Sequence, residues 1–180
     1  MGTDMHEGGC GCGAVRYRAV GEPIFANNCH CRLCQQQTGS TSGVNAFFES
    51  ENVELLSGTL DRAALKAGSG GDQIICSCSV CGTAVWSHYP MLGQGASAIR
   101  VGTLDHPGAI RLDAVIYTAS AMPWVAFPAD IPAFEGFYKA ADLLPPERLE
   151  RLRSVAKKAK EVQAASQAAS QAAPQGETRG

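Results

Sequence analysis

The sequence lacks both a marked excess of charge of either sign and any long apolar run. Its 15 Lys and Arg residues nearly balance 17 Asp and Glu residues, which gives a net charge of −2 and an isoelectric point near 6.1. Such a chain has no electrostatic footprint for nucleic acid or for an anionic membrane surface. No apolar run approaches the roughly 18 residues that a membrane-spanning helix requires. These absences predict a protein with no nucleic-acid partner and no membrane partner.

The start of the sequence also lacks the pattern of a secretory signal. Residues 1–11 contain Asp4, His6 and Glu7 and no apolar stretch, whereas a signal peptide has an apolar region of about 7 to 15 residues. We therefore expect a cytoplasmic protein whose thiols stay reduced. Clustered reduced cysteines are typical of metal binding. The alternative is four disulfides, whose pairing could not be deduced from the sequence.

What the sequence does have is eight cysteines, which all fall in three groups within its first half. Zinc binds four thiolates tetrahedrally at about 2.3 Å, and the short Cys-x-Cys and Cys-x-x-Cys spacings bring two sulfurs from one tight loop to one ion. Three such groups are more than one zinc ion can use, so the pattern predicts two metal sites. The groups are Cys10 and Cys12; Cys29, Cys31 and Cys34; and Cys76, Cys78 and Cys81.

The outer two groups supply the ligands of a closed site. Cys10 and Cys12 can present both sulfurs from one face of an extended segment, because alternate side chains of a strand share a face. Cys78 and Cys81 form a zinc-knuckle pair, followed by Gly82, which is free to take the positive φ of a tight turn. A site with four thiolates contributes to folding and leaves no position for a substrate.

The central group, Cys29, Cys31 and Cys34, supplies three thiolates and leaves one coordination position open, which is the arrangement of catalytic zinc. The spacing does not force this partition. Cys76 as a fourth thiolate would close the central site and give two structural sites with no chemistry. His30 lies between two ligands in an extended chain, so we expect it to point away from the metal.

Outside the cysteines, the sequence predicts an all-β core. Alternating and β-branched segments recur at short spacing between Gly and Pro residues, without long helical patterns. The predicted strands cover residues 15–20, 43–49, 53–56, 83–89, 97–104 and 109–118.

The character of the sequence changes near its C-terminal end. Pro145 and Pro146 resemble a helix start, and Leu149, Leu152 and Val155 recur at helical spacing. Beyond this helix, an Ala/Gln/Ser-rich tract predicts a solvated tail that is partly helical or disordered. We therefore expect a zinc-binding β domain over residues 6–138, a helix over residues 139–161 and a disordered tail over residues 162–180.

Several motifs in order resemble the glutathione-dependent formaldehyde-activating enzyme family, also called the centromere protein V/GFA domain. The first reads GCGCGAVRY, the second NCHCRLC and the third CSVCGT, and later pieces read VGTLD, AMPW and IPAF. The resemblance spans about residues 6 to 138. The motifs occupy residues 9–17, 28–34, 78–83, 101–105, 121–124 and 131–134.

The resemblance implies a mainly β fold, a β-tent of two small antiparallel sheets pinned by zinc, as in methionine sulfoxide reductase B. To this the chain adds the C-terminal helix and polar tail. It also implies two zinc ions per chain and no other cofactor. The extra thiol Cys76 departs from the family pattern. The implied ligands are Cys10, Cys12, Cys78 and Cys81 for structural zinc, and Cys29, Cys31 and Cys34 for catalytic zinc.

The activity that the resemblance implies is that of a carbon–sulfur lyase that joins formaldehyde to glutathione as S-hydroxymethylglutathione. Its partners are glutathione or another small thiol and a small aldehyde. Two other functions remain open. One is a non-catalytic zinc-binding interaction module, which would require a basic surface that this neutral chain lacks. The other is a redox enzyme like methionine sulfoxide reductase B, which needs a cysteine free of metal, and only Cys76 is available for that role.

Overall fold

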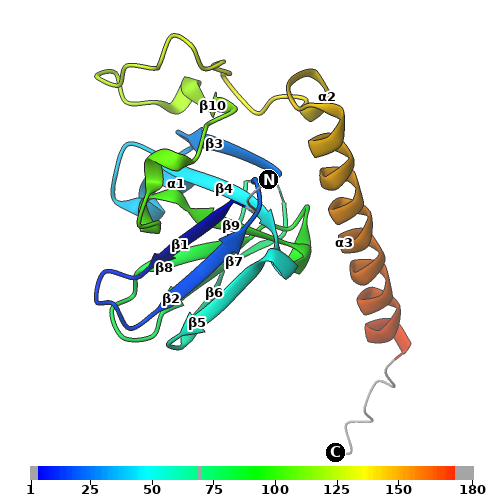
Figure 1. Cartoon of the computed structure of the whole chain (residues 1–180). Helices are drawn as coiled ribbons and strands as arrows, with labels where there is room; N and C mark the ends of the chain where they lie inside the picture. The colour runs from blue at the N-terminus through cyan, green and yellow to red at the C-terminus, as the bar shows by residue number, and fades with distance from the viewer. Residues whose placement is uncertain (1–3, 69, 173–180) are drawn as a thin grey trace, which may run out of the picture.

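The computed structural model describes residues 4–68 and 70–172 and is mainly β, with two sheets and a C-terminal helix (Figure 1). The predicted fold class is therefore confirmed. The smaller sheet has the strand order β1-β2-β5, and both of its pairings are antiparallel. Its strands are β1 (Met5–Gly9), β2 (Arg16–Val20) and β5 (Val53–Ser57).

The larger sheet has seven strands in the order β10-β3-β4-β9-β8-β7-β6. Its pairings are antiparallel except for β10 against β3, which run parallel. The expectation of two small antiparallel sheets did not include this size or the parallel pair. The strands are β3 (Phe25–Cys29), β4 (Gly43–Glu49), β6 (Leu60–Lys66), β7 (Asp72–Cys78), β8 (Ala84–His88), β9 (Ala96–Arg100) and β10 (Ala114–Ile116).

Two short helices and several single turns lie between the strands or follow the last of them. Helix α1 (Arg32–Thr38) follows β3 directly, and Gly39 ends it in the left-handed conformation at φ 61°, which glycine adopts without steric cost. Helix α2 (Ala140–Leu143) comes late in the chain. The 3₁₀ turns are η1 (Ser50–Asn52), η2 (Gly93–Gly95), η3 (Val101–Thr103), η4 (Pro107–Ala109) and η5 (Thr118–Ser120).

The C-terminal helix α3 (Pro146–Ala172) runs along one side of the β strands (Figure 1). Leu144 is extended and separates it from α2, because a residue that precedes proline avoids the helical region. The helix predicted over residues 139–161 is thus divided, and its second part continues to Ala172. Residues 173–180 of the predicted tail lie outside the described residues, and the division of the chain into a domain, a helix and a tail stays a prediction.

Apolar clusters on both sides of the larger sheet hold these layers together. Between the sheets, the buried rings of Tyr17 and Trp86 meet edge to face at 5.6 Å. On the other side of the larger sheet, Phe25 stacks on Phe47 at 4.1 Å, and Val155 of α3 packs in the same cluster. Burying such rings contributes stability beyond the area they remove from water.

Ion pairs join the first turns of α3 to β4 and to the residue before β10. Arg151 contacts Glu49 at 2.6 Å, and Arg148 contacts Asp113 at 2.5 Å. All four side chains are largely shielded from solvent, so these pairs hold their partners better than exposed ones do. Within the described part of the chain, no helix combines the length and apolarity that a membrane crossing requires.

Candidate metal centres

The structure brings the cysteines of the outer groups together in one cluster, here called the quartet. Cys10 and Cys12 lie in the loop after β1, Cys78 ends β7, and Cys81 lies in the following turn. Their four sulfurs all lie within 4.8 Å of one another. The sequence-predicted members of this group are therefore neighbours in space, although Cys12 and Cys78 are 66 residues apart.

The spacing of the quartet sulfurs fits a tetrahedral metal site. The Sγ atoms of Cys10 and Cys12 are 3.4 Å apart, and those of Cys12 and Cys78 are 3.9 Å apart. Four sulfurs at about 2.3 Å from a zinc ion would be separated by about 3.8 Å. A disulfide needs about 2.05 Å, and all eight cysteines are free. The donor set and its spacing therefore fit zinc.

Backbone turns set the positions of the quartet sulfurs. The Val15 N–H donates to the Cys10 sulfur at 3.2 Å, and the Gly82 N–H donates to the Cys78 carbonyl at 2.9 Å. Gly82 takes φ 73°, as the sequence predicted for a residue that follows a sulfur-bearing turn. The Thr83 hydroxyl lies 3.1 Å from the Cys81 sulfur, and this contact lowers the pKa of Cys81 to about 5.

Half of the quartet is open to solvent. Cys12 and Cys81 are exposed, whereas Cys78 is buried at the end of β7. Water therefore reaches the cluster and screens the charge of its thiolates. The quartet can hold a metal at the rim of the fold. The metal would link the loop between β1 and β2 to the β7–β8 turn.

The central cysteines also meet and form a second cluster, here called the trio. Cys29 ends β3, Cys31 is the N-cap of α1, and Cys34 lies in the first turn of that helix. Their sulfurs all lie within 4.8 Å of one another, and Cys29 and Cys34 are buried. The Cys34 N–H donates to the Cys31 sulfur at 3.4 Å, and this sulfur thereby caps the helix. The end of β3 and the start of α1 thus bring three sulfurs close together.

The three thiols of the trio influence one another's protonation. Contact with Cys29 and then with Cys34 lowers the pKa of Cys31 to about 2. Contact with Cys31 and then with Cys34 raises the pKa of Cys29. The cluster therefore gathers negative charge on Cys31, its most exposed member. Three sulfurs, one of which is readily ionised, fit a thiophilic metal ion such as zinc.

Cys76 belongs to neither cluster. Its side chain is 1% exposed and packs in the core between the sheets, whereas Cys29 and Cys34 belong to a different buried cluster. Burial raises the pKa of the Cys76 thiol. The geometry therefore gives no support to a central site closed by Cys76. Cys76 is the one cysteine outside the clusters, and it is buried. A redox enzyme would need this cysteine exposed.

His30 is not among the side chains that group with the trio, and it is buried. The ring is 1% exposed, its Nδ1 lies 3.1 Å from the Thr41 carbonyl oxygen, and Phe127 meets it edge to face at 5.2 Å. Its Nε2 atom has no hydrogen-bond partner within the described residues. With Nδ1–H donated to the carbonyl, Nε2 remains an acceptor.

Tyr117 is the neighbour of the trio that sequence reasoning missed. It follows β10, where Ile116 is paired with Cys29, and it packs against the trio cluster. Among the described residues it is the only non-glycine residue with positive φ, at 57°. Such a conformation is costly for a tyrosine. The sequence carries no signal for it, because backbone strain depends on the surrounding fold.

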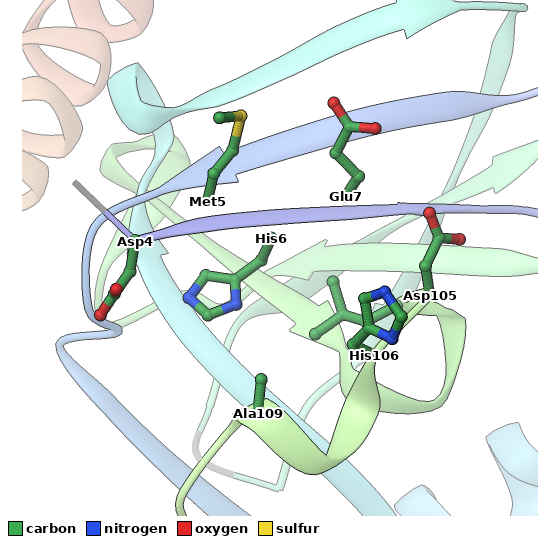
Figure 2. A pocket seen from close by; sticks show the side chains of 8 residues that line it. Asp4, Met5, His6, Glu7, Asp105, His106 and Ala109 are labelled. Atoms are coloured by element: carbon green, nitrogen blue, oxygen red, sulfur yellow. The ribbon is translucent and has the colours of Figure 1, made fainter. Parts of the chain in front are cut away.

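Cavities lie beside β1 and along α1. The larger, about 550 Å³, lies between β1 and the segment after β9 (Figure 2), and it holds neither cysteine cluster. Its lining residues are Asp4, Met5, His6, Glu7, Leu104, Asp105, His106 and Ala109. They include no set of three side chains close enough to hold a metal ion, counted over the described residues.

The smaller cavity, about 490 Å³, runs along α1, the helix that carries Cys34. Its walls combine amides, hydroxyls and one guanidinium with the apolar side chains of Met122 and Trp124, and Trp124 is 72% exposed. Trp124 falls within one of the motifs noted in the sequence, but no role was predicted for it. The lining residues are Arg32, Gln35, Gln36, Gly39, Ser40, Thr41, Met122 and Trp124.

Comparison with known proteins gives a family and similar solved structures. The family model described as "Glutathione-dependent formaldehyde-activating enzyme" matches residues 5–120. A crystal structure of a Rhodobacter sphaeroides protein is similar at 16% sequence identity and a TM-score of 0.43, over 71% of this chain and 98% of that chain. No curated protein matches the chain.

Proposed function

This chain belongs to the glutathione-dependent formaldehyde-activating enzyme family, and from that premise we propose that it is a zinc-dependent carbon–sulfur lyase. Membership supports a glutathione-dependent, formaldehyde-activating role at the level of the family. The finer proposal is that the chain joins glutathione, or another small thiol, to formaldehyde or a related small aldehyde. The protein would act in the cytoplasm.

The observation that carries the proposal is the difference in ligand number between the two clusters. The quartet offers four sulfurs and the trio offers three. We assign a structural zinc ion to Cys10, Cys12, Cys78 and Cys81, and a catalytic zinc ion to Cys29, Cys31 and Cys34. When bound to the trio, zinc would supply a charged centre that favours the thiolate form of a thiol and polarises an aldehyde oxygen.

The proposed reaction forms one carbon–sulfur bond. The sulfur of the deprotonated thiol attacks the aldehyde carbon, the carbon–oxygen double bond becomes a single bond, and the oxygen takes up the proton that the thiol lost. No electrons enter or leave, so the reaction requires no redox partner. The main tasks of the protein are to deprotonate the thiol and to hold both reactants together, because orientation removes much of the entropic barrier to addition.

The cavity along α1 supports a peptide-like thiol as the substrate. Arg32 has no carboxylate within 4.0 Å in the described part of the chain, and its Nη1 donates to the Gln35 side chain at 3.1 Å. A guanidinium held in this way can bind a carboxylate of glutathione. The exposed indole of Trp124 offers an apolar wall beside it.

Tyr117 is suited to contact the aldehyde oxygen. Burial, and then the charge of the trio cysteines, raises the pKa of its phenol, so it stays protonated at neutral pH. A protonated phenol beside the trio can donate a hydrogen bond to an oxygen that gains negative charge during addition. Its backbone strain is consistent with a position fixed for function rather than for local stability.

The test is catalysis of adduct formation with defined variants. The exchange rate between glutathione, ¹³C-formaldehyde and their adduct is measured by NMR, with and without the protein. We expect a rate above the spontaneous reaction for the native chain, none for Cys31→Ser, and a retained rate for Cys76→Ser, the matched control outside both clusters. No rate above the spontaneous one, across several thiols and aldehydes, would contradict the enzyme proposal and favour a non-catalytic zinc module.

A further inference from the structure

Arg100 is a buried cation beside the trio, and nothing in the sequence pointed to it. It ends β9 and is 6% exposed. Its Nη1 donates to the Asn45 side-chain oxygen at 2.7 Å, and its Nη2 donates to the Gln37 side-chain oxygen. Both acceptors are neutral amides, so these bonds fix the guanidinium without neutralising its charge.

The two amides are themselves held in place. The Gln37 amide donates to the side-chain oxygen of Gln73 at 2.9 Å, and Gln73 is fully buried. The Asn45 amide donates to the Gly43 carbonyl at 3.2 Å, and Asn45 pairs with Arg100 across β4 and β9. Because each acceptor has its own partner, the guanidinium has a single well-defined position.

Arg100 differs from the other partly buried arginines in its lack of a carboxylate. Arg148 and Arg151 each contact one, at 2.5 and 2.6 Å. Across the described residues, no carboxylate oxygen lies within 4.0 Å of the Arg100 guanidinium. A buried charge without a partner is strongly destabilising. The fold therefore implies a negative partner of another kind.

The position of Gly43 indicates where that negative partner lies. Its position is opposite Cys29 in the β3–β4 pairing. A Cβ atom at Gly43 would lie 3.1 Å from Arg100 Nη1 and 3.4 Å from the Cβ of Cys34. The missing side chain therefore leaves the guanidinium and Cys34 side by side around one small space.

The charges then balance. Three thiolates and one divalent metal ion carry a net charge of −1, and one guanidinium carries +1. We propose that Arg100 is the fixed counter-charge of the trio, a positioning residue that allows a negatively charged metal–thiolate group to remain buried. The inference rests on the proposed function in one respect, namely that the trio binds a divalent metal.

The quartet provides the internal comparison. Four thiolates and one zinc ion would carry −2, yet no arginine is needed there, because Cys12 and Cys81 are exposed and water screens their charge. Removing Arg100 should therefore weaken metal binding at the trio alone. Residues that support metal ligands from outside the ligand set typically change metal affinity by about 10- to 100-fold.

The test measures zinc affinity at each cluster by competition with a chromophoric chelator on the zinc-loaded protein. The zinc lost in Cys31→Ser identifies the trio. We expect Arg100→Met to lower zinc affinity of the trio by about 10- to 100-fold, with the quartet unchanged. Arg100→Lys, which keeps the charge, should recover most of the loss. Arg18→Gln is the matched control, because Arg18 has its own partner in Glu7 at 2.7 Å.

A second pair of variants keeps the inference testable if Arg100→Met does not fold. Gly43→Ala keeps every charge but crowds the guanidinium, so it should lower the zinc affinity of the trio by a few-fold. Gly102→Ala, where a Cβ meets nothing within 4 Å, should change neither cluster. Unchanged affinity of the trio in the Arg100 and Gly43 variants, or an equal fall at both clusters, would overturn the proposal. A native chain with no zinc at the trio would instead contradict the proposed function.

Discussion

The two cysteine clusters have similar chemistry but opposite settings. The quartet joins two turns that are far apart in sequence, and half of its cysteines are exposed. The trio comes from residues 29–34, and two of its three cysteines are buried. The cluster assembled over long range thus lies at the rim, and the cluster assembled locally lies inside.

Because of this difference, we expect the quartet to contribute mainly to the stability of the fold and the trio mainly to its chemistry. A metal held by the quartet closes a long loop, so it removes much of the conformational freedom of the unfolded chain. A metal held by the trio closes only a strand–helix turn and contributes less to folding. Burial gives the trio something else: a site with little competing water, in which the charges of Arg100 and the thiolates act strongly on each other.

The largest expected effect comes from breaking the quartet. Cys78→Ser should lower the melting temperature by more than roughly 10 °C or make the protein aggregate, because it opens the loop between the N-terminal hairpin and β7. Thermal unfolding followed by circular dichroism measures this. Cys76→Ser is the matched control, with the same substitution two residues earlier on the same strand. A smaller fall for Cys78→Ser than for Cys76→Ser would contradict the structural role of the quartet.

Breaking the trio should affect metal content and activity strongly and stability only slightly, the opposite of breaking the quartet. Cys31→Ser should remove one zinc ion and the catalysed adduct formation, and should lower the melting temperature by only a few degrees. Elemental analysis and the same unfolding experiment check both parts. If Cys31→Ser unfolds the chain as readily as Cys78→Ser, then the two clusters are equivalent and the comparison fails.

Partial metal removal should distinguish ligand number from exposure. With limiting chelator, we expect the trio to lose its zinc first, because three thiolates bind less tightly than four, even though the quartet is more exposed. Alkylation of the released thiols, followed by mass mapping, identifies the cluster. Labelling of Cys12 and Cys81 ahead of Cys31 would mean that solvent access, rather than ligand number, controls release.

The smallest expected effect on stability comes from the ion pair between Glu49 and Arg151 of α3. This pair belongs to neither cluster, so breaking it should change stability without changing metal binding. Burial raises the pKa of Glu49, but the hydrogen bond and charge of Arg151, with hydrogen bonds from the Glu49 backbone and the Asn52 side chain, together lower it by more, so the folded value lies below 4.5. The pair therefore stabilises the fold above about pH 4.5, and this contribution is lost as the pH falls through the folded pKa.

Arg151→Gln should accordingly lower the melting temperature by a few degrees at pH 7. The difference from the native chain should disappear in acid, and the zinc content at pH 7 should not change. A difference that persists at pH 3, or a loss of zinc at pH 7, would show that the arginine acts in another way.

Much of the candidate site was predictable because its determinants are local. Two sulfurs separated by one or two residues must share a turn, so the spacing alone paired Cys10 with Cys12 and Cys78 with Cys81. The positive φ of Gly82 follows from the same turn. Alternation along short segments was sufficient for the mainly β fold, since an apolar face has to be buried.

The predictions were incomplete where the answer depends on contacts between distant segments. The spacing left open whether Cys76 joins the trio, and only the registry of β7 in the larger sheet places it in the core between the sheets. The parallel pairing of β10 with β3 has no local signature. The helix continues to Ala172 through an Ala/Gln/Ser tract whose composition also suits a solvated tail.

The sequence by itself determined which neighbouring cysteines can bind one metal from a shared turn, because ligand spacing is a property of a few adjacent residues. Only the tertiary structure decided how each cluster is solvated and which charge faces it. Arg100 lies 55 residues from Asn45 along the chain, and it reaches the side of Cys34 because β4 pairs with both β3 and β9 and carries a glycine at the meeting point. Electrostatic balance in a buried site depends on distances through space, which sheet pairing sets and residue order alone does not.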